Sequence, residues 1–172
     1  MLKRLFGIFF ICLPILISAQ ELELSTIKAQ NSNLVGKVHF KKWFFDIYDA
    51  ELFTNTGKFN WDLPFLLKIH YLIDLQSKSI VTQTLKEISK QHPNEVKDNY
   101  QNYLDTFKMI IPNVAKNTNL YGYMDKDGYA NIYSDTRLLG TIQNKGLSKY
   151  FFEIWLSDKS SNIKLSKQLR GI

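Results

Sequence analysis

The sequence predicts an α+β fold, an open-faced β-sandwich in which a large, mostly antiparallel sheet carries a layer of helices on one face. Aromatic and β-branched residues, which favour strands, gather in VHFKKWFFDIYDAELF and FLLKIHYLID, residues 38–53 and 65–74. Apolar residues at helical spacing follow these segments, and further strands and helices are predicted later in the chain. The order of three strands, two helices, three strands and two helices favours one sheet covered by helices.

Residues 1–19 have the composition of a Sec-type signal peptide. Lys3 and Arg4 form a positively charged start, an apolar run from Leu5 to Ile17 follows, and small residues suited to cleavage precede Gln20. This run is shorter than the about 20 residues that a membrane-spanning helix needs. We therefore expect an exported, periplasmic or extracellular protein with no stable transmembrane anchor after signal cleavage. A retained N-terminal anchor is the alternative.

Residues 20–172 contain no internal repeat, low-complexity run or linker and predict one domain. The only cysteine, Cys12, lies in the signal peptide, so the mature chain would have no disulfide, thiolate metal site or cysteine nucleophile. The net charge of +6 becomes +4 when Lys3 and Arg4 are lost, because residues 1–19 contain no acid. The other basic residues are scattered among the acids without a basic stripe, and we expect no nucleic-acid partner.

The first two predicted strands precede the turn at residues 55–57. Apolar residues from Leu22 to Ile27 indicate a first strand, which ends around residues 31–33. Within residues 38–53 the apolar alternation changes phase twice, and a strand that changes phase needs an extra residue, a bulge, at each change. We therefore expect one long, bent strand with bulges at Lys41-Lys42 and Ile47-Tyr48.

The third predicted strand, residues 65–73, has the clean alternation of a strand with one buried face. Leu66 and Leu72 lie on its second face, which indicates that this face is partly covered. Apolar residues then recur at helical spacing in residues 80–88 and again in residues 96–111, and they predict two helices joined by a proline-containing turn.

The last part of the chain predicts three more strands and two more helices. Residues 120–123, 129–133 and 138–142 read as a meander, with an Asp-Gly hairpin turn between the first two of these strands. Large apolar residues at i, i+3, i+4, i+7 and i+8 in residues 147–155 predict an amphipathic helix that must dock on the sheet. A short helix at residues 162–169 ends the chain.

Several segments occur in the order and spacing of a known family. These segments are GKVHFKKWFFDIYDAELF, the approach from Trp61 to Pro64, LLGTIQN and FFEIWLSD. Over roughly residues 22–170 they resemble the chalcone isomerase-like superfamily, and more narrowly its secreted bacterial branch. The resemblance implies the open-faced β-sandwich already predicted. It also implies a divided function, because plant members cyclise chalcones around a central guanidinium whereas other members bind fatty acids in the equivalent cleft.

The catalytic groups of the isomerases are not matched in this chain. By spacing, their arginine falls near Asn31, and Arg137 and Arg170 lie in other segments. Their other polar groups fall near Trp43, Ile80, Gln83, Glu87 and Ile154-Trp155. Because this catalysis relies on donors aimed at a developing oxyanion, the resemblance implies no catalytic residue and leans against an enzyme. An isomerase or lyase acting on an unknown enone-type substrate is the alternative.

Candidate ligand-binding residues are Lys42, Trp43, Tyr48, Tyr71 and Trp155. A mostly apolar cleft with a few hydroxyls suits a lipophilic or carboxylate-bearing, fatty-acid-like molecule, and Lys42 could meet its carboxylate. The aromatic rings could equally be plain core, since large rings commonly fill the space between sheet and helices, and Lys42 could be a solvated residue. An envelope interaction or scaffold module is the remaining alternative.

No metal site or cofactor is expected. His39, His70 and His92 lie in three different segments without a partner at metal-ligand spacing. The segment Asp125 to Gly128 starts like a calcium loop but lacks the later glutamate. No Gly-x-Ser-x-Gly nucleophile elbow occurs.

Overall fold

The computed structural model describes residues 23–172, so the predicted signal peptide, residues 1–19, lies outside the described residues. Residues 23–30 are helical. The named strands are β1 (Asn33–Lys42), β2 (Phe45–Thr54), β3 (Phe65–Tyr71), β4 (Asn119–Met124), β5 (Ala130–Tyr133) and β6 (Leu138–Ile142). The named helices are α2 (Ser77–Gln91), α3 (Pro93–Ile110), α4 (Lys145–Leu156) and α5 (Ile163–Leu169).

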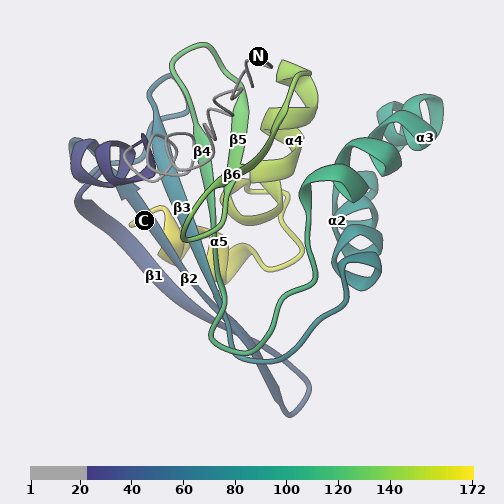
Figure 1. Cartoon of the computed structure of the whole chain (residues 1–172), viewed down its shortest axis with the longest axis horizontal. Coiled ribbons are helices and arrows are strands. Elements are labelled where there is room, and N and C mark those ends of the chain that lie inside the picture. Colours follow the sequence, from purple (N-terminus) through teal and green to yellow (C-terminus); the bar gives the residue numbers. More distant parts are fainter. Residues whose placement is uncertain (1–22) are drawn as a thin grey trace, which may run out of the picture.

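The strands form one antiparallel sheet in which each strand pairs with its neighbours in the sequence, in the order β1-β2-β3-β4-β5-β6. One face, here called the inner face, carries the helical layer (Figure 1). There α5 packs on β1 and β2, α4 packs on β5 and β6, and α2 packs on α3 and α4. The predicted fold class is therefore confirmed.

The predicted first strand at Leu22 to Ile27 is wrong, because residues 23–30 form a helix. Leu24 and Ile27 are three positions apart, a spacing that places both on one face of a helix but on opposite faces of a strand. They pack with Leu66, Tyr121 and Tyr133 in a small cluster separate from the main core. This helix covers part of the outer face of the sheet, as the apolar Leu66 on the second face of β3 indicated.

The long, bent strand predicted for residues 38–53 is also wrong, because this segment is a hairpin. The chain reverses at Trp43-Phe44, and Lys42 pairs with Phe45. The first phase change in the apolar pattern is therefore a turn, where a bulge at Lys41-Lys42 was expected. The turn escaped prediction because it contains none of the Gly, Asn or Pro residues that normally mark one.

The second phase change is a bulge, as predicted at Ile47-Tyr48. The register passes from the pair Phe40 and Tyr48 to the pair Lys41 and Asp46, which leaves Ile47 without a register partner on β1. Another register shift, between Leu34 and Gly36, was not predicted. The third strand and all later strands and helices lie where their periodicity placed them, within a few residues at each end.

The core fills the space between the inner face and the helices. Its largest fully buried rings come from three elements that are distant in the sequence: Phe65 of β3, Phe107 of α3 and Phe152 of α4. The rings of Phe65 and Phe152 meet edge to face with 4.8 Å between their centroids. Within residues 23–172, none of the helices combines the length and the apolar character needed to cross a bilayer.

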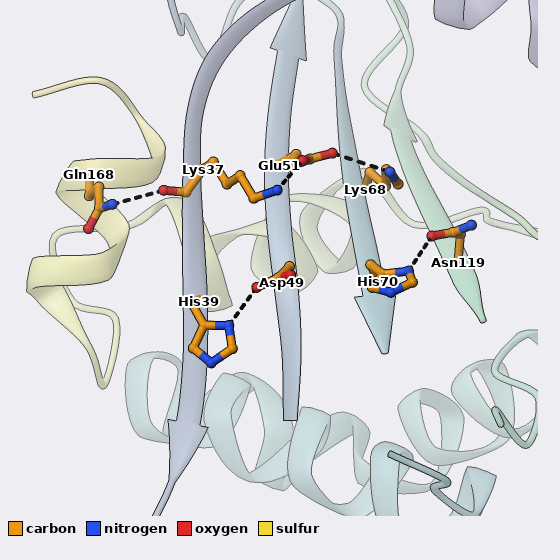
Figure 2. A network of polar contacts seen from close by, with 8 residues as sticks. All are labelled: Lys37, His39, Asp49, Glu51, Lys68, His70, Asn119 and Gln168. Carbon is orange, nitrogen blue, oxygen red and sulfur yellow. Dashed lines mark hydrogen bonds and ion pairs between the residues drawn. The ribbon is translucent and has the colours of Figure 1, made fainter. Parts of the chain in front are cut away.

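The contact between α5 and β1 leaves no room for a side chain at Gly36. A Cβ atom there would collide with the backbone carbonyl oxygens of Gln168 and Leu169. Gln168 Nε2 also donates a hydrogen bond of 2.9 Å to the backbone oxygen of Lys37, which joins α5 to the same strand (Figure 2). Close backbone packing thus fixes one edge of the helical layer.

We expect Gly36→Ala to lower the free energy of unfolding by about 1–3 kcal/mol, the usual cost of overpacking, because α5 must shift away from β1. Gly146→Ala is the matched control, since the nearest atom to its Cβ is Asn144 Oδ1 at 3.2 Å and alanine favours the helix. Denaturant unfolding measures both. Equal losses would contradict a clash specific to α5.

Candidate functional site

Three of the predicted ligand-binding residues meet on the inner face. Tyr48 of β2 and Tyr71 of β3 are register partners, and their rings stand edge to face with centroids 6.3 Å apart. Trp155 of α4 donates a hydrogen bond of 3.0 Å from Nε1 to the Tyr48 hydroxyl oxygen. Phe40 of β1 stacks on Tyr48 with 4.9 Å between the ring centroids. We call Phe40, Tyr48, Tyr71 and Trp155 the inner aromatic cluster.

The two tyrosine hydroxyls of this cluster keep their protons near pH 7. Burial raises the pKa of Tyr71 to about 12. Burial also raises the pKa of Tyr48, and this effect outweighs the hydrogen bond from Trp155, which acts in the opposite direction. Both phenols are therefore neutral near pH 7 and can act as hydrogen-bond donors.

Neither of these donors is used within the described residues. The Tyr48 oxygen accepts from Trp155, while its own proton has no acceptor among residues 23–172. Tyr71 is only 7% exposed, and its hydroxyl has no hydrogen-bond partner in the described part of the chain. The buried side-chain atoms without a partner in the described residues are Thr54 Oγ1 and Gln91 Oε1, so the Tyr71 hydroxyl is not sealed from solvent. Both phenol protons are open to an acceptor from outside the described chain, water or a ligand.

The other two predicted residues, Lys42 and Trp43, do not join the inner aromatic cluster. They lie at the turn of the β1–β2 hairpin, where both are exposed. The reason is the hairpin itself, because a bulge would have kept them within the sheet whereas a turn carries them beyond its end. A role of these two residues in ligand binding stays a prediction.

Glu87 of α2 is an ionised group close enough to influence the cluster, since its charge contributes to the raised pKa of Tyr48. Burial acts to raise the pKa of Glu87, but hydrogen bonds from Lys90 and Ser161 outweigh it and hold that pKa below its usual range. Lys90 Nζ lies 2.8 Å from Glu87 Oε1. The negative charge is thus compensated by a neighbouring cation.

Two surface grooves lie elsewhere in the described structure. The larger, of about 690 Å³, runs between α2 and α3 and is lined by Thr82, Leu85, Lys86, Ser89, Lys90, Pro93, Val96, Lys97 and Tyr100. The smaller, of about 260 Å³, includes Asn31 and Tyr123. Neither is lined by the inner aromatic cluster. Sequence reasoning missed the larger groove, although the i, i+4 spacing of Lys86 and Lys90 indicates a basic strip on one helix face.

The outer face carries two rows of polar residues across neighbouring strands (Figure 2). In one row, His39, Asp49, His70 and Asn119 stand directly opposite one another on β1 to β4. His39 Nδ1 lies 2.6 Å from Asp49 Oδ1, and His70 Nδ1 lies 2.9 Å from Asn119 Oδ1. The sequence placed these histidines in unrelated segments, and only the strand register brings them into one row.

The second row contains an ion-pair network in which Lys37 and Lys68 share Glu51. The distances from Nζ to the Glu51 carboxylate are 2.8 Å and 3.3 Å respectively. Despite these acids and histidines, no group of three or more His, Cys, Asp or Glu residues in the described chain is arranged to hold a metal ion. The two outer rows consist of polar side chains that pair with one another across the strands.

The two arginines of the described residues do not reach the inner aromatic cluster by any hydrogen bond or ion pair. Arg137 is exposed in the turn between β5 and β6. Arg170 follows α5 and pairs with Asp158. Asn31, where the isomerases' arginine falls by spacing, lies just after the first helix and donates to the backbone oxygen of Ile27. Asn31 therefore does not lie on a strand of the sheet, although the comparison by spacing placed it on one.

Comparison with known proteins gives one family match and a structural likeness. The chain matches the model of a family described as chalcone isomerase-like over residues 22–171. A solved structure of a fatty-acid binding protein from Arabidopsis thaliana superposes with a TM-score of 0.61 and 9% sequence identity, covering 81% of this chain and 84% of that chain. At this identity the likeness shows a shared fold. No curated protein matches the chain.

We expect Tyr48→Phe to lower the free energy of unfolding by about 1–3 kcal/mol, because the indole N–H of Trp155 loses its acceptor. Tyr71→Phe removes a hydroxyl that has no partner within the described residues, and we expect a change close to zero. Urea unfolding of both variants measures the difference. A loss for Tyr71→Phe as large as that for Tyr48→Phe would contradict the assignment of the hydrogen bond.

We expect His39 to titrate above about 6.5, the ordinary pKa of histidine. Its Nε2 and Nδ1 each lie 2.6 Å from a carboxylate oxygen, of Asp46 and Asp49 respectively, and only the protonated ring can donate from both nitrogens. Hydrogen bonds to Asp46 and then to Asp49 accordingly raise the pKa of His39.

Because the folded pKa is raised, the stabilisation of the hairpin by this ring is complete below about pH 6.5 and is lost as pH rises through the folded value. Proton NMR titration of the His39 ring measures the pKa, and Asp49→Asn should lower it. A wild-type value at or below the ordinary one would show that the two carboxylates do not hold the charged ring.

Proposed function

The chain belongs to the chalcone isomerase-like family, and on this premise we propose that it is a non-catalytic binding protein for a fatty-acid-like molecule. The molecule would lie between the sheet and the helices, with its carboxylate at the inner aromatic cluster. The export signal predicted in residues 1–19 would direct the protein to the periplasm or the extracellular space. N-terminal sequencing of the protein recovered from its own compartment tests that part of the proposal.

The pair of unused hydroxyl donors on Tyr48 and Tyr71 is the observation that carries the proposal. An ionised carboxylate only accepts hydrogen bonds, and hydrogen bonds to an ionised group are the stronger kind. The two phenols lie on paired neighbouring strands with ring centroids 6.3 Å apart, and we expect one carboxylate to accept a hydrogen bond from each. Their raised pKa keeps both protons in place near pH 7.

The surroundings of these donors suit an acyl chain. Phe40 and Trp155 supply apolar ring surface, and the partly buried Ile80 of α2 and Ile154 of α4 pack against the same core. Because neither surface groove is lined by the cluster, we expect entry to require α2 and α4 to move apart. One polar contact that joins these helices lies near the surface, between His92 at the end of α2 and Glu153 of α4.

The structural likeness adds support of a general kind. The Arabidopsis protein that shares the fold is a fatty-acid binding protein by name, so this architecture is compatible with a lipophilic ligand. The chemistry of the cluster favours binding over proton abstraction, because a phenol with a raised pKa is a poor base near pH 7. Donors that stay neutral can hold an anion without reacting with it.

We expect the protein to bind a long-chain fatty acid, and Tyr71→Phe to weaken this binding about tenfold or more. The basis is a hydrogen bond to an ionised group, worth about 1.5–3 kcal/mol, where about 1.4 kcal/mol corresponds to tenfold in Kd. Isothermal titration calorimetry with wild type and variant measures the change. The methyl ester of the same acid should bind both with similar affinity, because its uncharged head loses less when one donor is removed.

Tyr100→Phe in the groove between α2 and α3 is the matched control and should leave the affinity unchanged. If Tyr100→Ala or Lys97→Ala weakens binding while Tyr71→Phe does not, the ligand lies in that groove and the proposed site is wrong. Absence of binding across fatty acids of different length would overturn the proposed function as a whole.

A further inference from the structure

The tip of the β1–β2 hairpin, residues 41–45 with the sequence KKWFF, exposes three consecutive aromatic side chains. Trp43 is 85% exposed, Phe44 98% and Phe45 62%. Exposed apolar residues are common when they are single, but adjoining ones mark an interaction site. The tip extends beyond the other strands at the bottom of Figure 1, so these rings stand clear of the rest of the domain.

The base of the hairpin holds these rings in place. Lys41 Nζ lies 2.7 Å from Asp46 Oδ1 across the two strands. His39 bridges Asp46 and Asp49 on β2. The backbone pairing continues up to the last pair, Lys42 with Phe45. The aromatic side chains are therefore presented by an ordered turn.

The backbone at Trp43 gives a second, independent indication. Trp43 has a φ of +58°, a left-handed conformation that is uncommon for a bulky residue and that Gly, Asn or Asp adopts more readily in a two-residue hairpin turn. The side chain makes no compensating contact with the core, because it is almost fully exposed. An outlier that the fold does not need is grounds for a functional hypothesis.

The charge next to the rings indicates the kind of surface that they would meet. The side chain of Lys42 forms no ion pair or hydrogen bond with any described residue, and Lys42 lies directly beside Trp43 in the sequence. Tryptophan is enriched where hydrocarbon meets head groups, and lysines near a membrane are attracted by anionic lipids. A convex tip of three rings is also too small for the about 800 Å² per partner of a standard protein interface, whereas a deformable lipid surface can enclose it.

We propose that the hairpin tip docks on the surface of an anionic lipid bilayer. The aromatic residues 43–45 enter the interface between head groups and acyl chains, and Lys42 meets the lipid phosphates. This docking needs no ligand in the domain and goes beyond the proposed fatty-acid binding. The two are connected by position, because Phe40 and Tyr48 of the inner aromatic cluster lie on the same two strands, just behind the tip.

The test measures binding of the chain from residue 20 onward to vesicles, since its described residues contain the whole sheet and its core and the apolar run of residues 5–17 would bind lipid by itself. Vesicles of phosphatidylcholine with phosphatidylglycerol are compared with vesicles of phosphatidylcholine alone. We expect flotation with the anionic vesicles, a blue shift of tryptophan emission, and weaker binding at high salt.

The decisive variant is Trp43→Gly with Phe44→Ser. In this turn φ is positive at Trp43 and not at Phe44, and a hairpin turn of that kind takes Gly at its first central position, so the variant removes two rings while preserving the hairpin. We expect its partition onto anionic vesicles to fall at least tenfold. Lys42→Glu should weaken binding to anionic vesicles only. Met109→Ser removes an exposed apolar side chain from α3, 76% exposed, and should have no effect.

Three results would overturn the proposal: no binding of the wild type to anionic vesicles, equal binding by the Gly-Ser variant, or a wild-type dimer in light scattering that the variant abolishes without vesicle binding. The last result would assign the tip to a second copy of the chain. Tyr71→Phe, which changes the inner aromatic cluster and leaves the tip intact, should dock on anionic vesicles like the wild type, so failure of docking and failure of the proposed function are distinguishable.

Discussion

The register of the antiparallel sheet is the constraint on which the rest of this structure depends, because side chains alternate between the two faces and a slip of one residue would exchange them. The register that places Tyr48 opposite Tyr71 on the inner face also places Asp49 opposite His70 on the outer face. The aromatic, lipophilic side and the polar side of the sheet are therefore two consequences of the same pairing. The bulge at Ile47 adjusts this pairing between the tip of the hairpin and the cluster.

Local periodicity predicted most of the fold, and long-range pairing explains what it left out. The clean alternation of β3 and the helical spacing in α4 each carry enough signal to define an element alone. The helix at residues 23–30 was mistaken for a strand because its short apolar pattern is mixed: the spacing of Leu22 and Leu24 fits a strand, and that of Leu24 and Ile27 fits a helix. The turn at Trp43-Phe44 was hidden because aromatic residues with high strand propensity occupy it, so the sequence reads as a continuous strand through the point of reversal.

The candidate site could be predicted to a similar extent. Tyr48, Tyr71 and Trp155 were expected to converge because alternation and helical spacing already placed them on the faces that meet. Lys42 and Trp43 were assigned to the same region only because a bulge was expected where the chain turns. The row from His39 to Asn119 could not be predicted from the sequence, because it requires the register of four strands to be known together. Likewise, only the three-dimensional structure shows that the hydroxyl protons of Tyr48 and Tyr71 have no acceptor among the described residues.

Two local features that stability alone does not require occur at the same end of the sheet. Tyr71, the last residue of β3, is only 7% exposed, and its hydroxyl has no acceptor among the described residues. Trp43 holds a left-handed backbone conformation with its ring in solvent. Natural sequences tend to break local rules at functional sites and to compensate elsewhere. Here the paired strands of the hairpin hold the turn at Trp43 in its left-handed conformation. Phe40 stacks on Tyr48, and the Tyr48 ring packs against Tyr71, whose hydroxyl proton has no acceptor in the described part of the chain. A lipophilic anion would satisfy the donor, and a lipid surface would cover the rings, so one class of partner accounts for both features.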